Sequence, residues 1–119
     1  MPHRKMSFSM TTEAVRRHKK TVTRRLGWWF LEPEDLLEAV ERCMGLKKGE
    51  HVVPLADIVV LSTWREPLSD ILIYGPEEMA REGFPDMSAP DFIDRFVHYN
   101  RHKHCHPWTP VNRIEFGYV

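Results

Sequence analysis

Two arginines and two tryptophans lie close together near the amino end of the sequence. Arg24 and Arg25 precede Trp28 and Trp29 by a few residues. Guanidinium groups donate hydrogen bonds to phosphate oxygens, and flat indole rings stack on nucleobases. If residues 21–25 form a strand, successive side chains point to opposite faces, so at most one of the two arginines contacts a ligand. The pattern predicts a nucleotide-binding surface in which at least one tryptophan is purely structural.

A second group of reactive side chains lies in the segment 98–106. It holds imidazoles and one thiol, which are good zinc ligands: His98, His102, His104, Cys105 and His106. The spacing is poor, because residues 104–106 would have to fold tightly on themselves and no CxxC frame supplies further ligands. We therefore expect an exposed, proton-sensitive loop beside a nucleic-acid surface, with no metal and no other cofactor.

The charged residues balance in number but not in position. The chain has 17 Lys and Arg and 17 Asp and Glu. Residues 1–25 hold eight basic residues against one acidic (+7), residues 26–96 hold six against fifteen (−9), and residues 97–119 hold three against one (+2). A basic cluster predicts a positive field on one surface, whose usual partner is a phosphate backbone or a phosphorylated small molecule. A solvated basic helix without a ligand is the alternative.

The elements that must position these residues follow from capping signals and hydrophobic spacing. Helices are expected where Thr, Ser or Pro precedes early acids: at 13–18, 76–83 and 90–99. Extended segments are expected where β-branched or alternating residues gather: at 21–23, 52–64 and 111–119. A stripe on the third helix faces the core: Phe92, Ile93, Phe96 and Val97. Residues 45–50 predict a turn and residues 100–110 a loop.

Length and composition bound the class of protein. The chain has 119 residues, of which 42% are hydrophobic, which suits one domain with its own core over 1–119. No apolar run approaches the ~20 residues of a membrane helix, and the first residues lack the apolar stretch of a secretory signal. Cys43 and Cys105 are expected to be reduced thiols. We predict a cytoplasmic protein in which residues 1–5 form a flexible extension.

Several segments resemble the ASCH family, whose domains have a PUA-like fold. The most specific is the Lys-Thr-x-Thr-x-Arg signature at 20–25, and three others support it: residues 41–50, the Arg-Glu-Gly-Phe-Pro-Asp box at 81–86, and the closing strand at 111–116. The resemblance covers about residues 6–119. It implies an α+β fold, a small β-barrel of five or six mostly antiparallel strands with two or three short helices.

The resemblance also bears on an ambiguous segment at residues 32–41. Pro33, the early acids and the leucine spacing favour a helix by propensity. The family commonly has a Pro-Gly-Asp turn that leads into a strand, where this chain has Pro33-Glu34-Asp35. We therefore expect a strand at 36–43, preceded by a turn in which Glu34 tolerates a positive φ less well than glycine.

A site is implied by the same resemblance. In one branch of ASCH-like proteins, small amidohydrolases remove the acetyl group from N4-acetylcytidine with a lysine, a threonine and a glutamate, which match Lys20, Thr23 and Glu82. A threonine hydroxyl is a weak nucleophile that needs a nearby base, and a lysine is a base only when neutral. Neighbouring cations and partial burial would lower the pKa of Lys20. Without catalysis, Lys20 would clamp a phosphate and Glu82 would be a surface acid.

Three functions thus remain open for a basic cleft built from residues 16–25 and closed by 76–86. The first is binding of RNA or a modified nucleoside or nucleotide, contacted by Lys19, Thr21, Arg24, Arg25 and Trp28. The second is hydrolysis of an amide on a nucleobase, with Thr23 attacking, Lys20 as base and Glu82 as acid. The third is a protein-interaction adaptor that uses the acidic middle of the chain.

Overall fold

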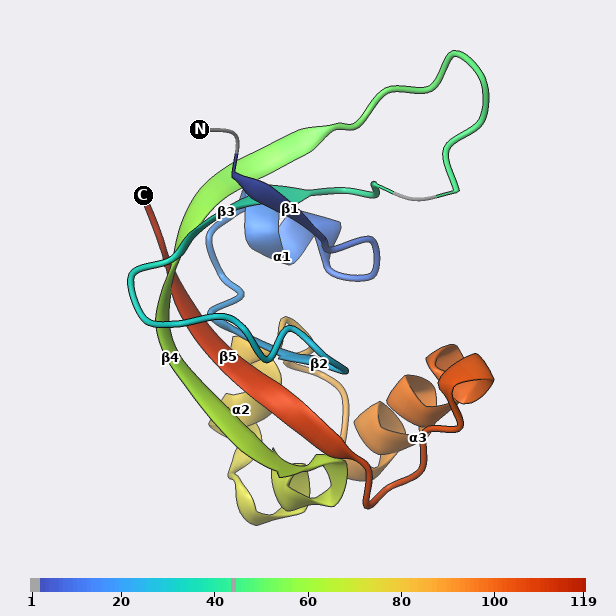
Figure 1. Ribbon diagram of the computed structural model, residues 1–119. Coiled ribbons are helices and arrows are strands. Elements are labelled where there is room, and N and C mark those ends of the chain that lie inside the picture. Colours follow the sequence, from blue (N-terminus) through green and yellow to red (C-terminus); the bar gives the residue numbers. More distant parts are fainter. Residues whose placement is uncertain (1–2, 44) are drawn as a thin grey trace.

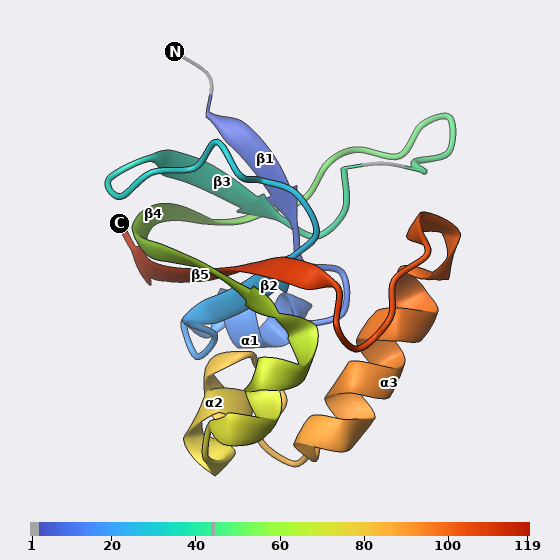
Figure 2. The same ribbon diagram turned by 60° about the horizontal axis from the view of Figure 1, so that its bottom comes forward.

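The computed structural model describes residues 3–43 and 45–119, and within them five strands form one sheet in the order β1-β3-β4-β5-β2. The strands are β1 (Arg4–Ser7), β2 (Val22–Arg25), β3 (Leu36–Val40), β4 (Pro54–Pro67) and β5 (Pro110–Tyr118). The helices are α1 (Thr12–Arg16), α2 (Pro76–Arg81) and α3 (Ala89–Tyr99), with 3-10 turns η1 (Leu68–Ile73) and η2 (Arg101–Lys103). The sheet curls into an open half-barrel (Figure 1), and the three α-helices gather on one side of it (Figure 2).

β4 is the strand around which the sheet curls. It pairs antiparallel with β3 on one side and with β5 on the other, and β5 pairs antiparallel with β2. β1 is the exception, because it runs parallel to β3. A shift of register between Val60 and Ser62 marks a bulge, which bends a strand and increases its twist. The predicted α+β fold, a curled and mostly antiparallel sheet of five strands with three short helices, is therefore confirmed in the described residues.

Two hydrophobic clusters stabilise the fold. The first packs α1 against the sheet and includes Met6, Phe8, Val15, Ile58 and Phe116. The second packs α3 against η1 and the start of β5 and includes Leu68, Ile71, Phe92, Ile93 and Val111. The predicted stripe of α3 is confirmed, since Phe96 and Val97 pack against this second cluster. Ser88 caps α3 as predicted, accepting a hydrogen bond from the backbone N–H of Asp91.

The start of the chain differs from the expectation of a flexible extension. Arg4 and Lys5 belong to β1, opposite Leu37 and Glu38 of β3, while residues 1–2 lie outside the described part. The reason is that strand pairing uses backbone groups, which the basic side chains leave free. Met6 then anchors the strand, because its side chain is fully buried.

The ambiguous segment forms a strand, as the resemblance implied and propensity did not. Glu34 occupies the left-handed region at φ 77° and Leu36–Val40 forms β3. Two backbone hydrogen bonds hold this turn against β4: Glu34 N–H donates to the Val60 carbonyl at 2.7 Å, and Val60 N–H donates to the Asp35 carbonyl at 2.9 Å. Tertiary contacts thus override both the helical propensity and the unfavourable φ. In the described residues, no helix combines the length and the apolar character needed to cross a membrane.

Candidate functional site

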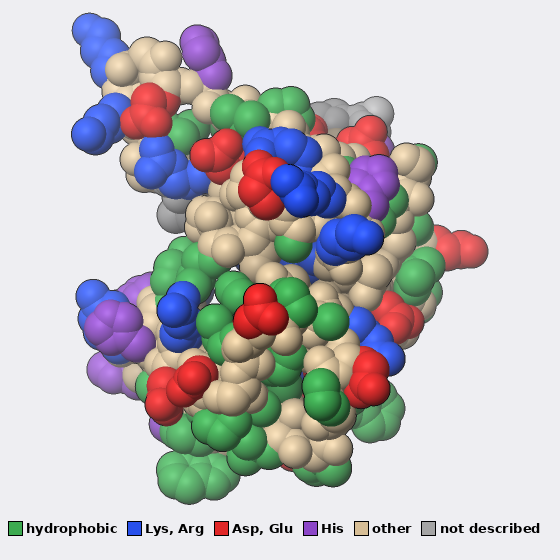
Figure 3. All heavy atoms as spheres, turned by 180° about the vertical axis from the view of Figure 1, so that it is seen from behind, with side chains coloured by type: hydrophobic (Ala, Val, Ile, Leu, Met, Phe, Trp, Pro, Cys, Tyr) green, Lys and Arg blue, Asp and Glu red, His purple; other side chains and the backbone are tan. Residues whose placement is uncertain are grey.

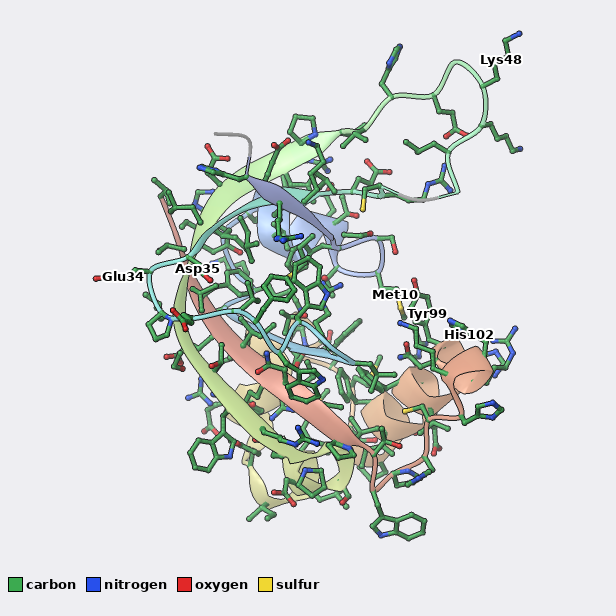
Figure 4. All side chains as sticks on the ribbon, in the orientation of Figure 1. Met10, Glu34, Asp35, Lys48, Tyr99 and His102 are labelled. Atoms are coloured by element: carbon green, nitrogen blue, oxygen red, sulfur yellow. The ribbon has the colours of Figure 1, made fainter. Side chains whose placement is uncertain are left out.

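A cavity of about 130 Å³ lies where the two hydrophobic clusters meet, walled by the β1–α1 loop, β2, the end of α2 and α3. One part of its wall is charged or polar: Lys20, Thr23, Arg24, Arg25, Glu82 and Arg95. Another part is aromatic: Phe8, Phe84, Phe92, Phe96 and Tyr99. Met10 and Tyr99 extend toward one another at the open side (Figure 4). The cavity therefore combines flat apolar faces with hydrogen-bond donors.

A buried ion pair forms its floor. Lys20 and Glu82 are only 3% and 2% exposed, and Lys20 Nζ donates to Glu82 Oε1 at 3.0 Å as well as to the Glu82 carbonyl. Burial lowers the pKa of Lys20, although Glu82 acts in the opposite direction. A lysine in this setting reaches its neutral, basic form more easily than one in water.

Arg24 connects Glu82 to a larger buried network. Its Nη1 lies 2.8 Å from Glu82 Oε2, while Nη2 lies 2.5 Å from Glu78 Oε2 and 3.5 Å from Glu66 Oε2. Arg113 adds a further cation, with Nε 2.7 Å from Glu78 Oε2. Together with Lys20, the two arginines thus make three basic side chains that face three carboxylates. Such burial is tolerable because each charge has partners, and losing one partner is costly.

Glu78 is the most strongly held carboxylate. Its side chain is fully buried, and burial by itself disfavours the charged form. Hydrogen bonds from Arg113 and Arg24, with the charges of both, prevail and lower the pKa of Glu78 from 4.5 to about 2. Glu78 is therefore ionised at neutral pH.

Arg25 and Thr23 form the polar edge of the cavity. Arg25 Nε donates to Thr23 Oγ1 at 3.0 Å, and Arg25 Nη2 donates to the Ser7 carbonyl at 2.6 Å. The guanidinium also lies over the Phe8 ring, 4.7 Å from its centroid. Burial lowers the pKa of Arg25 to about 10, so it stays a cation at neutral pH. Among the described residues it has no carboxylate within ion-pair distance, which leaves its charge available to a ligand.

Comparison with known proteins gives a structural match. No protein-family model and no curated protein matches the chain. An ASCH domain from Lactobacillus crispatus JV V101 matches with a TM-score of 0.71 at 12% identity, over 98% of this chain and 79% of that one. The chain has an ASCH-like fold. Protein EF3133 from Enterococcus faecalis V583, described with the family DUF984, matches with a TM-score of 0.69 at 14% identity, over 100% of this chain and 77% of that one.

A third solved structure, hypothetical protein PH0355, has a TM-score of 0.63 at 13% identity and is covered over 97% of its length by 98% of this chain. Identities this low establish the ASCH-like fold alone. The chemistry of the site must be argued from this chain's own residues.

Within the ASCH-like fold, five of the predicted site residues line one cavity. Lys20, Thr23 and Glu82 meet there although 62 positions separate the first from the last. Arg24 and Arg25 both line it, whereas strand alternation predicted opposite faces. The long Arg24 side chain reaches the floor of the cavity, where its Nη1 donates a hydrogen bond to Glu82. Arg24 is however enclosed by carboxylates and is not the free cation that the sequence indicated.

Three further predicted contacts lie elsewhere. Lys19 is exposed and does not line the cavity. Thr21 contributes a backbone contact, because its N–H donates a hydrogen bond to the Arg81 carbonyl at 2.9 Å. Trp28 packs against the first cluster, and its carbonyl accepts a hydrogen bond from Asn112 Nδ2 at 3.0 Å. Of the predicted segment 16–25, only residues within 20–25 line the cavity, together with residues from 7–11, 82–87 and 92–100.

The histidine-rich segment lies at the end of α3. His98, His102, His104 and His106 are exposed and Cys105 is buried. Within the described part of the chain, no three His, Cys, Asp or Glu side chains converge as a metal site requires. Cys43 and Cys105 are both free, and burial raises the pKa of the Cys105 thiol.

Proposed function

We propose that this chain binds RNA or a modified nucleotide by holding one nucleobase in the cavity. The supporting observation is the pairing of aromatic faces with donors at fixed positions. The ring centroids of Phe84 and Phe92 lie 5.9 Å apart in an edge-to-face arrangement, and both rings line the cavity together with Arg25. Bases are recognised by stacking on aromatic rings and by donors directed at their edges. With about 130 Å³, the cavity is smaller than the roughly 300–1,000 Å³ of drug-sized sites and suits one ring system.

The electrostatics of the lining agree with an electron-rich ligand. In the buried network, the basic side chains of Lys20, Arg24 and Arg113 are each within ion-pair distance of a carboxylate. Arg25 and Arg95 then remain as cations of the lining without a carboxylate partner in the described residues. Base carbonyls and phosphate oxygens are acceptors for such groups.

The test is a binding measurement with nucleosides and their 5′-monophosphates, including N4-acetylcytidine, by calorimetry. Arg25→Met should weaken binding about tenfold or more, equivalent to about 1.4 kcal/mol, because it removes the available cation. Lys19→Met changes a neighbouring exposed lysine outside the cavity and should leave affinity unchanged. Circular dichroism establishes that both variants fold. Absence of binding to every compound of the panel, or equal effects of the two variants, would contradict the proposal.

Hydrolysis of an amide on the bound base is a second candidate, favoured by the burial of Lys20 against Glu82 in a cavity that Thr23 also lines. In this reaction Thr23 Oγ attacks the acyl carbon while its proton passes to the neutral Lys20 amine. Lys20 then returns the proton to the departing base nitrogen, and water cleaves the acyl-threonine to release the acid. Glu82 accepts hydrogen bonds from Lys20 and Arg24, so it holds Lys20, the general base of the reaction, in place.

Hydrolysis is tested by incubating the protein with N4-acetylcytidine and measuring cytidine by chromatography. Thr23→Val should abolish release while binding persists, and Thr23→Ser should retain part of it because it keeps the hydroxyl. If the unaltered protein binds the compound without releasing cytidine, or if Thr23→Val releases it equally fast, the chain binds and does not hydrolyse.

A further inference from the structure

We infer that the carboxyl-terminal end of α3 is a second contact site, for the phosphate backbone of single-stranded RNA that places one base in the cavity. The site consists of Arg95, Arg101 and Lys103, here called the α3 patch. This inference rests on the proposed function and commits it to a polynucleotide. It concerns a surface outside the buried network.

Charge is the first argument. Arg95, Arg101 and Lys103 are exposed, and none of them forms an ion pair within the described residues. The acids of α3, Asp91 and Asp94, precede the patch, and no Asp or Glu follows until residue 115. Figure 3 shows Lys, Arg and His side chains gathered at this end of the molecule, beside the hollow between its two halves. An uncompensated cluster of this kind is complementary to successive phosphates.

Three other surface cations differ from the α3 patch because each lies close to a carboxylate. Arg17 lies 3.7 Å from Glu13, Lys5 lies 3.9 Å from Glu38, and Arg42 lies 2.7 Å from Glu50. Arg101 instead donates to the His98 carbonyl at 2.8 Å, so the helix end orients its guanidinium without neutralising it. The α3 patch therefore keeps its charge.

Position is the second argument. Arg95, Tyr99 and Asn100 line the cavity, and Arg101 and Lys103 follow directly in η2. Tyr99 is 57% exposed although it is a large ring at the cavity's open side. Figure 4 shows His102 next to it at the end of α3. An exposed ring at the mouth can stack the base that flanks the one in the cavity.

Extent distinguishes RNA from a free nucleotide. Arg95 lies at the cavity, whereas Lys103 lies at the end of η2, beyond the end of α3. One phosphate attached to a base in the cavity does not serve both positions, while a strand that continues past Tyr99 carries further phosphates along the patch. An acidic peptide would match the charge but has no base for Tyr99 and the cavity.

The experiment measures fluorescence anisotropy of labelled pentamers of cytidylate and uridylate, with the free 5′-monophosphates in parallel. Lys103→Glu should weaken pentamer binding about tenfold or more, because it removes a phosphate contact and adds a repulsive charge. Lys48→Glu makes the same charge change at the tip of the β3–β4 loop, away from α3 (Figure 4), and should have at most a twofold effect. Neither variant should alter monophosphate affinity. The slope of log K against log salt should flatten by about 0.7 in Lys103→Glu.

Equal weakening by Lys103→Glu and Lys48→Glu would overturn the inference, since it would reflect net charge alone. So would pentamers that bind no more tightly than monophosphates, or a polyglutamate peptide that competes as well as RNA. These failures are distinct from failure of the proposed function. A chain that binds monophosphates in an Arg25-dependent way keeps the proposed function and loses only the α3 patch. Pentamer binding that depends on Lys103 and not on Arg25 would instead support the α3 patch as a phosphate contact and contradict the proposed function.

Discussion

Arg24 joins three carboxylates from two parts of the chain. Glu66 comes from β4, Glu78 from α2 and Glu82 from the residue that ends α2. The guanidinium is planar and presents several donors in a fixed geometry, so it holds these groups in set directions. Because Glu82 also binds Lys20, the position of Lys20 depends on contacts that lie behind the cavity.

Glu78→Gln should destabilise the protein by about 3–5 kcal/mol, because it leaves buried cations without their main partner. Urea denaturation followed by circular dichroism measures the loss. Glu77→Gln is the matched control, an exposed neighbour on the same helix, and should change stability by less than about 0.5 kcal/mol. Similar urea midpoints for the two variants would show that the network contributes nothing.

Acid should remove the same contribution. The pKa of Glu78 is about 2 in the folded protein against 4.5 ordinarily, so the unfolded chain takes up the proton first. The stabilisation is therefore complete above about pH 4.5 and is lost as the pH falls to 2, amounting to about 3 kcal/mol at 1.36 kcal/mol per unit. Urea midpoints between pH 5 and 2.5 should fall more steeply for the unaltered protein than for Glu78→Gln. Parallel declines would contradict this.

Of the individual residues of the site, the sequence predicted several that line the cavity but not the carboxylates behind them. The signature at 20–25 indicated Lys20 and Thr23, and the box at 81–86 indicated Glu82. Glu78 looked like an ordinary first-turn acid of a short helix, although its spacing of four from Glu82 puts both on one helix face. Glu66 gave no signal, because a carboxylate inside a β-rich segment acquires meaning only when its partner Arg24 is known to lie opposite.

Among the elements, the turn after α2 determines where Glu82 and the lower wall lie. Gly83 has φ +94°, and a Cβ there would meet Thr11 Cγ2 at 3.1 Å and Ala14 Cβ at 3.2 Å. Only glycine combines this φ with so close an approach to α1. The turn therefore fixes the distance between α2 and the β1–α1 loop, which are two walls of the cavity.

Gly83→Ala should cost about 1–3 kcal/mol and weaken ligand binding, because it combines backbone strain with a steric conflict. Gly49→Ala isolates the first factor, since Gly49 has φ +89° but no atom within 4 Å of an added Cβ. Urea denaturation and calorimetry of both variants give the comparison. If Gly49→Ala is as destabilising as Gly83→Ala, the close contact of residue 83 with α1 does not contribute to the loss of stability.

Elements with strong local signals were predicted well and those defined by partners were not. The caps and apolar stripe of 90–99 indicated α3 to within one residue of Ala89–Tyr99. β1 was missed because Arg4 and Lys5 show no apolar alternation, and its pairing with β3 is parallel and distant. The role of α3 as a cavity wall was also missed, since its stripe indicated only the core, whereas its Arg95 and Tyr99 also line the cavity.

For the whole molecule, folding changes the meaning of the charge pattern. The basic first segment and the acidic middle of the sequence suggested two surfaces of opposite sign. In the structure, Lys20 and Arg24 of the first meet Glu66, Glu78 and Glu82 of the second inside the protein. Part of the asymmetry, the charges of Lys20 and Arg24, is thus compensated internally, and the α3 patch near the other end of the chain carries exposed positive charge.

A ligand held between both hydrophobic clusters should stabilise the molecule as a unit. At a hundredfold excess over Kd, linkage predicts about 2.7 kcal/mol of added stability. Thermal melting with and without the best-binding nucleotide should show a rise of several degrees for the unaltered protein and a smaller one for Arg25→Met. A rise that is equal in both would place the ligand away from the cavity.

The strand order also has a consequence for synthesis on the ribosome. β2 carries Thr23, Arg24 and Arg25, and its neighbour in the sheet is β5, which follows every other element in the sequence. A nascent polypeptide that has emerged as far as Asn100 already contains all the side chains of the cavity but has no strand to hold β2 in place. We therefore expect ligand capture to begin only after Pro110–Tyr118 has left the exit tunnel, so that partial translation products remain inert.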